Sequence, residues 1–187
     1  MVGRKVSAGA GVDDGGGEDR DPRRREDRVD APRLWHAGEG MVGARRGGGR
    51  ELLVVNTHWD HVGEQARRAS ARLVRVRATT LAQGAPVLVM GDFNTPIDTS
   101  GPDDAGWILR DGAGDGLPRW LDTWRATAAP ATGTFHAFTG TPQSGRIDAI
   151  LATAEFAVLA AAVVDTSVGA VFPSDHFPVT AVVRLDR

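Results

Sequence analysis

Two short apolar runs separated by a helix-length stretch constrain the fold of this chain more than any other feature. Residues 52–55 and 86–90 are almost entirely apolar, which is typical of strands buried on both faces. Between them, residues 64–83 repeat apolar or small side chains at spacings of three and four, which predicts a helix with one buried stripe. The predicted stripe consists of Ala66, Ala69, Leu73, Val76 and Thr80. A strand, a helix and a second strand form an α/β crossover unit with two parallel strands.

The rest of the chain is predicted to add mainly strands. A short helical turn is expected at residues 107–109, between Gly-rich and Pro-rich loops. The candidate strands that follow are residues 121–124, 134–138, 146–152, 158–165 and 179–185. An α/β unit followed by several strands predicts an α/β fold in which mixed sheets pack on one another.

The composition changes abruptly near residue 51. Residues 1–50 hold 12 of the 24 glycines and few large apolar side chains. Such a segment cannot bury enough apolar surface to offset its ordering entropy, so we predict a low-complexity, largely disordered or degenerate segment. Residues 51–187 are then the folded domain. A basic arm for nucleic acid is the alternative for residues 20–50, although the interleaved acidic residues disfavour it.

Composition excludes several classes of protein. The chain has no cysteine, which rules out disulfides, zinc–thiolate sites and thiol catalysis. A formal net charge of −2 disfavours a generally basic nucleic-acid-binding surface. No apolar run approaches the roughly 18 residues of a membrane-spanning helix, and residues 1–10 lack the apolar region of a signal peptide. We therefore expect a cytoplasmic protein, with secretion of a longer form left open.

Four polar motifs lie at the ends of predicted strands. They are Asn56-Thr57-His58, Gly91-Asp92-Phe93-Asn94, Arg146-Ile147-Asp148 and Ser174-Asp175-His176. The carboxyl ends of parallel strands meet at one edge of a sheet, which is where α/β proteins place their ligands. We therefore expect the motif side chains to converge on one cleft. Carboxylates, an amide and imidazoles without a serine or cysteine nucleophile suit Mg²⁺-assisted phosphoester hydrolysis.

Each motif alone also has a purely structural interpretation. An isolated His58 could serve packing, and Asp148 could cap the end of a strand. Asp175 and His176 could form a turn that enters the last strand. The functional interpretation therefore rests on all four motifs together. His136 belongs to none of the motifs and is predicted to be non-catalytic.

In this order, the four motifs resemble the endonuclease/exonuclease/phosphatase superfamily, which includes pancreatic-type DNases, abasic-site endonucleases, deadenylases and inositol-polyphosphate phosphatases. Residues 56–71 (NTHWDHVGEQARRASA) are most similar to its bacterial branch of small metal-dependent hydrolases. The resemblance covers residues 51–187. It implies a four-layer α/β sandwich of the DNase I-like kind, incomplete at its N-terminus, and hydrolysis of phosphate esters. The implied substrate is a phosphorylated small molecule, a lipid head group or a nucleic acid.

The resemblance also implies roles for the residues around the first two motifs. His58 would contact the scissile phosphate or act as an acid near the leaving group. Asp92 would orient and activate the attacking water. Asn94 would hold Asp92 and donate a hydrogen bond to a phosphate oxygen.

The remaining implied roles fall on later residues and on the predicted helix. Asp148 would fix the orientation of His176, which would donate to the phosphate. Asp175 would lie beside the metal ion. His61 and Arg67 would line the mouth of the substrate site, with a helix cap or a surface position as the alternative.

One departure from the family concerns the metal. Members carry an early strand with an Asn and a second strand with a Gln-Glu pair, whose Glu is the main ligand of Mg²⁺ or Mn²⁺. This sequence shows neither, so it resembles a truncated member with impaired activity. The alternative is a non-catalytic fragment or pseudoenzyme that retains a phosphate-binding cleft. Glu18 and Glu39 are the residues that could supply a substitute carboxylate.

Overall fold

The structure is a computed structural model, and it describes residues 40–47, 50–130, 132–169 and 171–186. The predicted low-complexity segment therefore lies outside the described residues as far as residue 39. No helix within the described ranges is long and apolar enough to cross a lipid bilayer.

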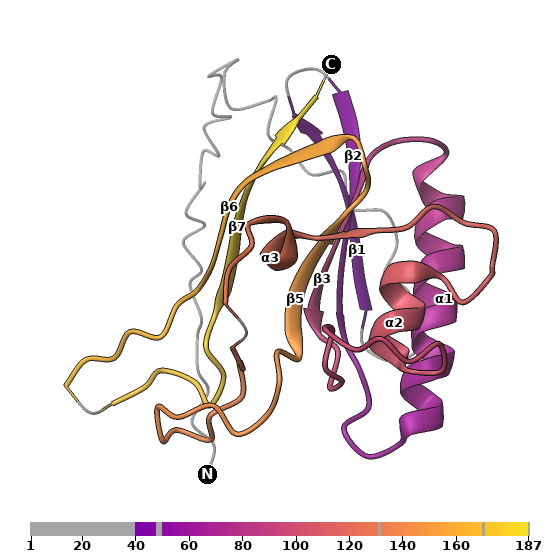
Figure 1. Cartoon of the computed structure of the whole chain (residues 1–187). Coiled ribbons are helices and arrows are strands. Elements are labelled where there is room, and N and C mark those ends of the chain that lie inside the picture. Colours follow the sequence, from indigo (N-terminus) through magenta and orange to yellow (C-terminus); the bar gives the residue numbers. More distant parts are fainter. Residues whose placement is uncertain (1–39, 48–49, 131, 170, 187) are drawn as a thin grey trace, which may run out of the picture.

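A five-stranded mixed sheet forms the centre of the fold (Figure 1). Its strands follow the order β1-β2-β3-β5-β4, and only β2 and β3 run parallel to each other. The strands are β1 (Gly40–Gly47), β2 (Arg50–His58), β3 (Val87–Asp92), β4 (Leu121–Asp122) and β5 (Asp148–Ala152). This arrangement brings the last residues of β2 and β3 and the first residue of β5 to one edge of the sheet.

The first strand differs from the predicted division of the chain at residue 50. Residues 40–47 form β1, which pairs antiparallel with β2 along its whole length. The Gly-rich composition of this stretch concealed the strand. Its backbone hydrogen bonds to β2 do not depend on large apolar side chains, which were the signal that placed the boundary at residue 51.

The predicted crossover unit is confirmed. Helix α1 (Glu64–Ala82) connects β2 to β3, and a second helix, α2 (Ala105–Asp111), packs beside it. α1 ends where Gln83 adopts a left-handed backbone conformation, with a φ of 48°. Both helices lie on the same side of the five-stranded sheet (Figure 1).

The predicted buried stripe of α1 is wrong. All five of its residues are exposed, and the buried face consists of Ala71, Val74, Arg75, Ala78 and Ala82. The cause is Arg75, whose fully buried guanidinium donates to the carboxylate of Asp115 at 2.6 and 3.1 Å and to the backbone carbonyl of Leu109 at 2.9 Å. Charged residues ordinarily mark the exposed face of a helix, but this fully paired arginine lies on the buried face.

A second, two-stranded sheet packs on the other side of the central sheet (Figure 1). It consists of β6 (Phe156–Val163) and β7 (Val179–Leu185), which pair antiparallel. The short helix α3 (Thr123–Ala126) contacts both β5 and β6. Within the described residues the layers therefore follow the order helix, sheet, sheet.

Two predicted strands are much shorter in the structure. The strand expected at residues 121–124 stops after two residues, because the carboxylate of Asp122 accepts a hydrogen bond from the amide of Trp124 and starts α3. The strand expected at residues 134–138 is reduced to a single bridge between Phe135 and His176.

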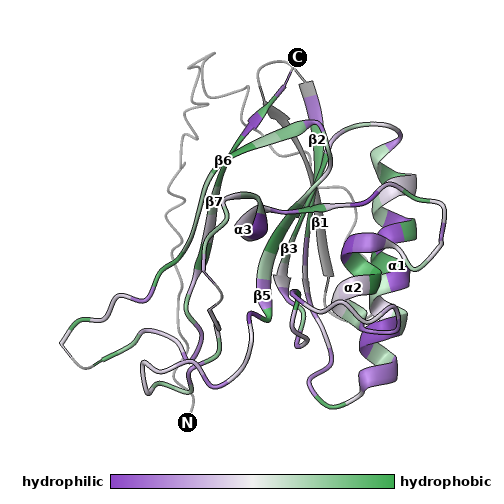
Figure 2. Ribbon diagram, in the orientation of Figure 1, coloured by the Kyte–Doolittle hydropathy of each residue, from purple (hydrophilic) through white to green (hydrophobic). Residues whose placement is uncertain are grey.

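The hydrophobic core lies between the central sheet and α1 and α2. Figure 2 shows the apolar character of β2 and β5, whereas hydrophilic and hydrophobic residues are mixed along α1. Leu53, Val55 and Val89 from the sheet and Ile108 and Leu109 from α2 belong to one buried cluster. This packing fixes the strands whose ends carry the candidate site.

Candidate active site

The ends of β2 and β3 bring His58, Asp92 and Asn94 together. His58 pairs in register with Asp92 across the two parallel strands, and its Nε2 lies 3.4 Å from Oδ2 of Asp92. The amide of Asn94 donates to Oδ1 of the same carboxylate at 2.8 Å. Asn94 has a φ of 48°, and its side chain is held by a 2.9 Å hydrogen bond to the carbonyl of Trp59. These contacts hold the Asp92 carboxylate beside His58.

A second pair approaches Asp92 from the other side. Asp148 is the first residue of β5 and pairs directly with Asp92 across the antiparallel strands. Nδ1 of His176 lies 2.7 Å from Oδ2 of Asp148, and its Nε2 lies 3.9 Å from Oδ2 of Asp92. An ionised carboxylate only accepts hydrogen bonds, so Nδ1 of His176 carries the proton and donates it. Nε2 is thereby directed at the space in front of Asp92.

The charges around this cluster shift two pKa values. Burial raises the pKa of Asp92 above its ordinary value of 3.8, and the neighbouring charge of Asp148 raises it further, against the opposing amide of Asn94. Burial alone would lower the pKa of His176. The hydrogen bond to Asp148 and the charges of Asp148, Asp92 and Asp175 outweigh it, so this pKa lies above its ordinary value of 6.5. His176 is thus favoured as a hydrogen-bond donor near neutral pH.

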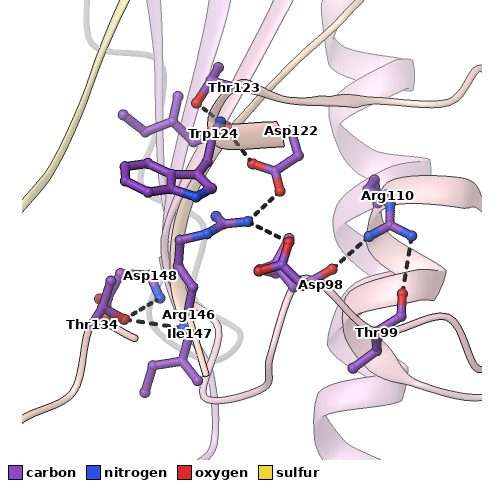
Figure 3. Close-up of polar contacts among 12 residues, drawn as sticks. Asp98, Thr99, Arg110, Asp122, Thr123, Trp124, Thr134, Arg146, Ile147 and Asp148 are labelled. Carbon is purple, nitrogen blue, oxygen red and sulfur yellow. Dashed lines mark hydrogen bonds and ion pairs between the residues drawn. The ribbon is translucent and has the colours of Figure 1, made fainter. Parts of the chain in front are cut away.

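An arginine two residues before Asp148 anchors this end of β5. Arg146 is almost fully buried, and its guanidinium donates to the carboxylates of Asp122 and, at 3.0 Å, Asp98 (Figure 3). Burial raises the pKa of Asp122 in spite of the attraction of Arg146. Sequence reasoning included Arg146 in a motif but missed both aspartates, because neither stands in a motif of its own.

The side-chain atoms of Asp92, Asp148 and His176 are chemically suited to bind a divalent cation. Within the part of the chain that the structure describes, Asp92, Asp148 and His176 can place one ligand atom each so that all lie within 4.8 Å of one another. Mg²⁺ is commonly held by one or two carboxylates, with water and substrate phosphate completing the coordination. The two facing carboxylates offer that pair of oxygens. Glu18 and Glu39, the possible substitute ligands, lie outside the described residues.

Asp175 lies beside the cluster rather than within it. Its carboxylate is not one of the three groups within 4.8 Å, and one of its oxygens lies 3.4 Å from the hydroxyl of Ser174. Its charge acts on His176, and its backbone carbonyl accepts hydrogen bonds from the amides of His136 and Ala137 at 2.8 and 3.1 Å.

The two residues expected at the substrate mouth lie around the start of α1. His61 is exposed in the loop after β2. Arg67 reaches back from the first turns of α1 and donates to the carbonyl of Asp60 at 3.1 Å. The carboxylate of Asp60 in turn accepts from the amides of Val62 and Gly63, which lowers the pKa of this carboxyl. In the structure Arg67 therefore stabilises the loop that follows His58.

A cavity of about 550 Å³ lies elsewhere, between α2 and α3. Trp107, Arg119 and Arg125 are among its lining residues. The six residues predicted to converge on one cleft do not line this cavity, so its size is not evidence for the position of the site. These residues are His58, Asp92, Asn94, Asp148, Asp175 and His176.

The described residues thus combine an α/β architecture with a histidine that is oriented by one carboxylate and faces a second carboxylate at the strand ends. A sequence model of the endonuclease/exonuclease/phosphatase family matches residues 6–176. The chain belongs to this family, which confirms the resemblance and the fold class read from the motifs. A search of curated proteins found no match.

Solved structures support the same assignment. A Bacteroides thetaiotaomicron structure described as mannosyl-6-phosphatase Bt3783 is 27% identical, with a TM-score of 0.63 over 78% of this chain and 56% of that one. An endonuclease/exonuclease/phosphatase from Bacteroides vulgatus is 27% identical, with a TM-score of 0.65 over 79% and 55%. Humanized D. rerio TDP2, at 16% identity, has a TM-score of 0.60 over 78% and 60%, which shows the shared fold. The chain thus spans little more than half the length of these relatives.

Proposed function

We propose that this chain is a divalent-metal-dependent phosphoesterase. The observation that carries the proposal is the approach of two imidazoles to one carboxylate. Nε2 of His58 and Nε2 of His176 lie 3.4 and 3.9 Å from the same Oδ2 of Asp92. A tetrahedral phosphate group in front of Asp92 would meet a proton acceptor and two nitrogen donors.

The geometry supports a separate task for each group. Asp92 accepts the proton of the water that attacks phosphorus. His176, protonated and oriented by Asp148, donates from Nε2 to a phosphate oxygen whose negative charge grows in the transition state. His58, with its side chain 58% exposed at the edge of the cluster, gives a proton to the departing oxygen. The water proton and the leaving-group proton are therefore handled by different residues.

The metal would be held by carboxylate oxygens of Asp92 and Asp148, with Asp175 close by. A bound Mg²⁺ or Mn²⁺ supplies neutralisation of phosphate charge and a lowered pKa of bound water. The direct pairing of Asp92 with Asp148 supports this assignment, because two neighbouring carboxylates repel each other less when a cation is bound to them.

The substrate class is proposed from chemistry and from the relatives. Phosphorylated small molecules, lipid head groups and nucleic acids all present the same phosphate oxygens to the cluster. The relative described as a mannosyl-6-phosphatase makes sugar phosphates the first class to test.

The test is turnover of a bis-aryl phosphodiester and of a hexose 6-phosphate by the full chain with Mn²⁺, with Mg²⁺ and with EDTA. We expect hydrolysis that EDTA abolishes and that Asp92→Ala reduces by at least about a thousandfold, equivalent to about 4 kcal/mol of the barrier. Asp165→Ala is the matched control, because this exposed aspartate lies in the loop after β6.

The two possible failures have different meanings. If neither substrate is turned over but inorganic phosphate binds in a manner that His176→Ala abolishes, the chain is a non-catalytic protein with a phosphate-binding cleft. Turnover that survives Asp92→Ala would mean that the cluster is not the active site.

A further inference from the structure

The His176–Asp148 pair joins two segments that belong to different sheets. Asp148 begins β5 in the central sheet, whereas His176 lies in the segment that leads into β7 of the second sheet. No strand pairing connects β5 to β7 within the described residues. Backbone pairing between these two strands therefore does not set the 2.7 Å contact between Nδ1 of His176 and Oδ2 of Asp148.

One buried residue bonds to both segments. The hydroxyl oxygen of Thr134 accepts hydrogen bonds from the amides of Ile147 and Asp148, each at 3.1 Å (Figure 3). The backbone carbonyl of Thr134 accepts a hydrogen bond from the amide of Phe177 at 2.8 Å. The side chain of Thr134 therefore binds the start of β5, and its main chain binds the residue after His176.

The neighbours of Thr134 add to this connection. The next residue, Phe135, forms a bridge with His176 and places its ring edge-on to the imidazole, with 5.1 Å between ring centroids. The amide of His136 donates to the carbonyl of Asp175 at 2.8 Å. Thr134 itself has no exposed surface, so water does not compete for its hydroxyl.

We propose that Thr134 is a positioning residue that sets the distance and orientation of the His176–Asp148 pair. The inference rests on the proposed function for its kinetic consequence, but the geometric part concerns the free protein. Valine at this position would keep the shape of the side chain and remove the acceptor, which leaves the amides of Ile147 and Asp148 without a partner at the start of β5. Serine would keep the acceptor.

The kinetic test compares Thr134→Val with Thr134→Ser. We expect kcat to fall about 10- to 100-fold in Thr134→Val, because small displacements of catalytic groups cost rates of this size, with KM within about twofold. Thr134→Ser should retain kcat within about threefold. Thr123→Val is the matched control, because Thr123 is also buried and its hydroxyl also bonds to β5, but at the carbonyl of Ile150, away from the site.

A double-mutant cycle separates positioning from general destabilisation. If Thr134 acts through Asp148, Thr134→Val should change kcat by less than about twofold in an Asp148→Asn background. A full additional loss in that background would overturn the proposal, and so would an unchanged kcat in Thr134→Val.

A spectroscopic readout covers the case in which the chain has no activity. The proton on Nδ1 of His176 should give a low-field proton NMR resonance in the free protein, which His176→Gln identifies by its loss. We expect Thr134→Val to broaden or remove this resonance and Thr134→Ser to keep it. Absent turnover in the unmodified chain would contradict the proposed function alone, whereas an unaltered resonance in Thr134→Val would overturn the role of Thr134.

A further variant serves if Thr134→Val does not fold. Thr134→Ala leaves room for a water molecule to bind the two amides, but that water holds them less rigidly. At least about a tenfold loss of kcat is expected in Thr134→Ala, and a kcat equal to that of the unmodified chain would overturn the proposal.

Discussion

Asp92 and Asp148 are directly paired residues on antiparallel strands, so the sheet places two carboxylates side by side at its edge. Like charges opposite each other destabilise a sheet. His176 lies between them, 2.7 Å from Asp148 and 3.9 Å from Asp92, and partly offsets the repulsion. The fold therefore maintains a locally unfavourable charge arrangement at the position where the proposed chemistry needs it.

Replacing Asp92 by asparagine should stabilise the metal-free protein while abolishing activity. The pKa of Asp92 is higher in the folded chain than the ordinary value of 3.8. The destabilising effect of its charge is therefore absent below about pH 3.8 and complete above the folded pKa. We expect Asp92→Asn to gain about 0.2–1 kcal/mol at about pH 7.5, and nothing at about pH 3.5, by urea denaturation in EDTA.

Asp165→Asn provides the comparison for this measurement, because it removes an exposed charge of the same kind. Its stability should stay within about 0.5 kcal/mol of the unmodified chain at both pH values. A loss of stability in Asp92→Asn at neutral pH would contradict the view that the carboxylate pair is strained.

The loss of kcat caused by replacing His58 should depend on the leaving group. A nitrophenolate leaves without a proton, whereas an alkoxide needs one. If His58 is the proton donor, His58→Gln should lower kcat about a hundredfold for an alkyl phosphate ester and less than about tenfold for a nitrophenyl ester. Equal losses for both esters would instead assign His58 to contact with the scissile phosphate.

Gly91 should tolerate no side chain. It pairs with Thr57 across the parallel strands at a φ of 145°, and a Cβ there would lie 1.8 Å from the carbonyl oxygen of Thr57. We expect Gly91→Ala to lose roughly 2–5 kcal/mol of the free energy of unfolding. Gly84 also has a positive φ, of 87°, but open space around it, so Gly84→Ala should cost only about 1–2 kcal/mol. Similar losses in the two variants would refute the steric argument.

The inverted face of α1 can be tested with two valines. Val74 is 3% exposed and belongs to the core, whereas Val76 is 51% exposed. Thermal unfolding should show a loss of about 2 kcal/mol for Val74→Ala and less than about 0.5 kcal/mol for Val76→Ala. A larger loss for Val76→Ala than for Val74→Ala would support the buried stripe that the sequence spacing predicted.

Strands and helices could be predicted from the sequence wherever one simple pattern dominated. β2 and β3 are continuous apolar runs because helices and strands cover them, and the bounds of α1 were correct to one residue. The buried face of α1 could not be predicted, because both faces carry alanine and valine and the decisive residue is Arg75. Its partner Asp115 lies 40 positions further along the chain. β1 was missed because its residues are mostly small or charged.

The composition of the candidate site followed from strand-end position, but its internal geometry did not. Parallel pairing brings His58 to Asp92, and this could be anticipated from the crossover unit. The direct pairing of Asp92 with Asp148 depends on the register of β5, which no local signal encodes. Thr134 was missed for the same reason, because a threonine in a predicted strand gives no indication that its hydroxyl bonds to a distant strand.

The division of the site between two sheets makes the proposed reaction a reporter of tertiary assembly. Asp92 and Asp148 come from one sheet and His176 from the approach to the other. A folding intermediate with both sheets formed but not yet docked would have native secondary structure and no competent His–Asp pair. During refolding, far-ultraviolet circular dichroism should therefore recover before turnover does, and the lag between the two would time the docking step.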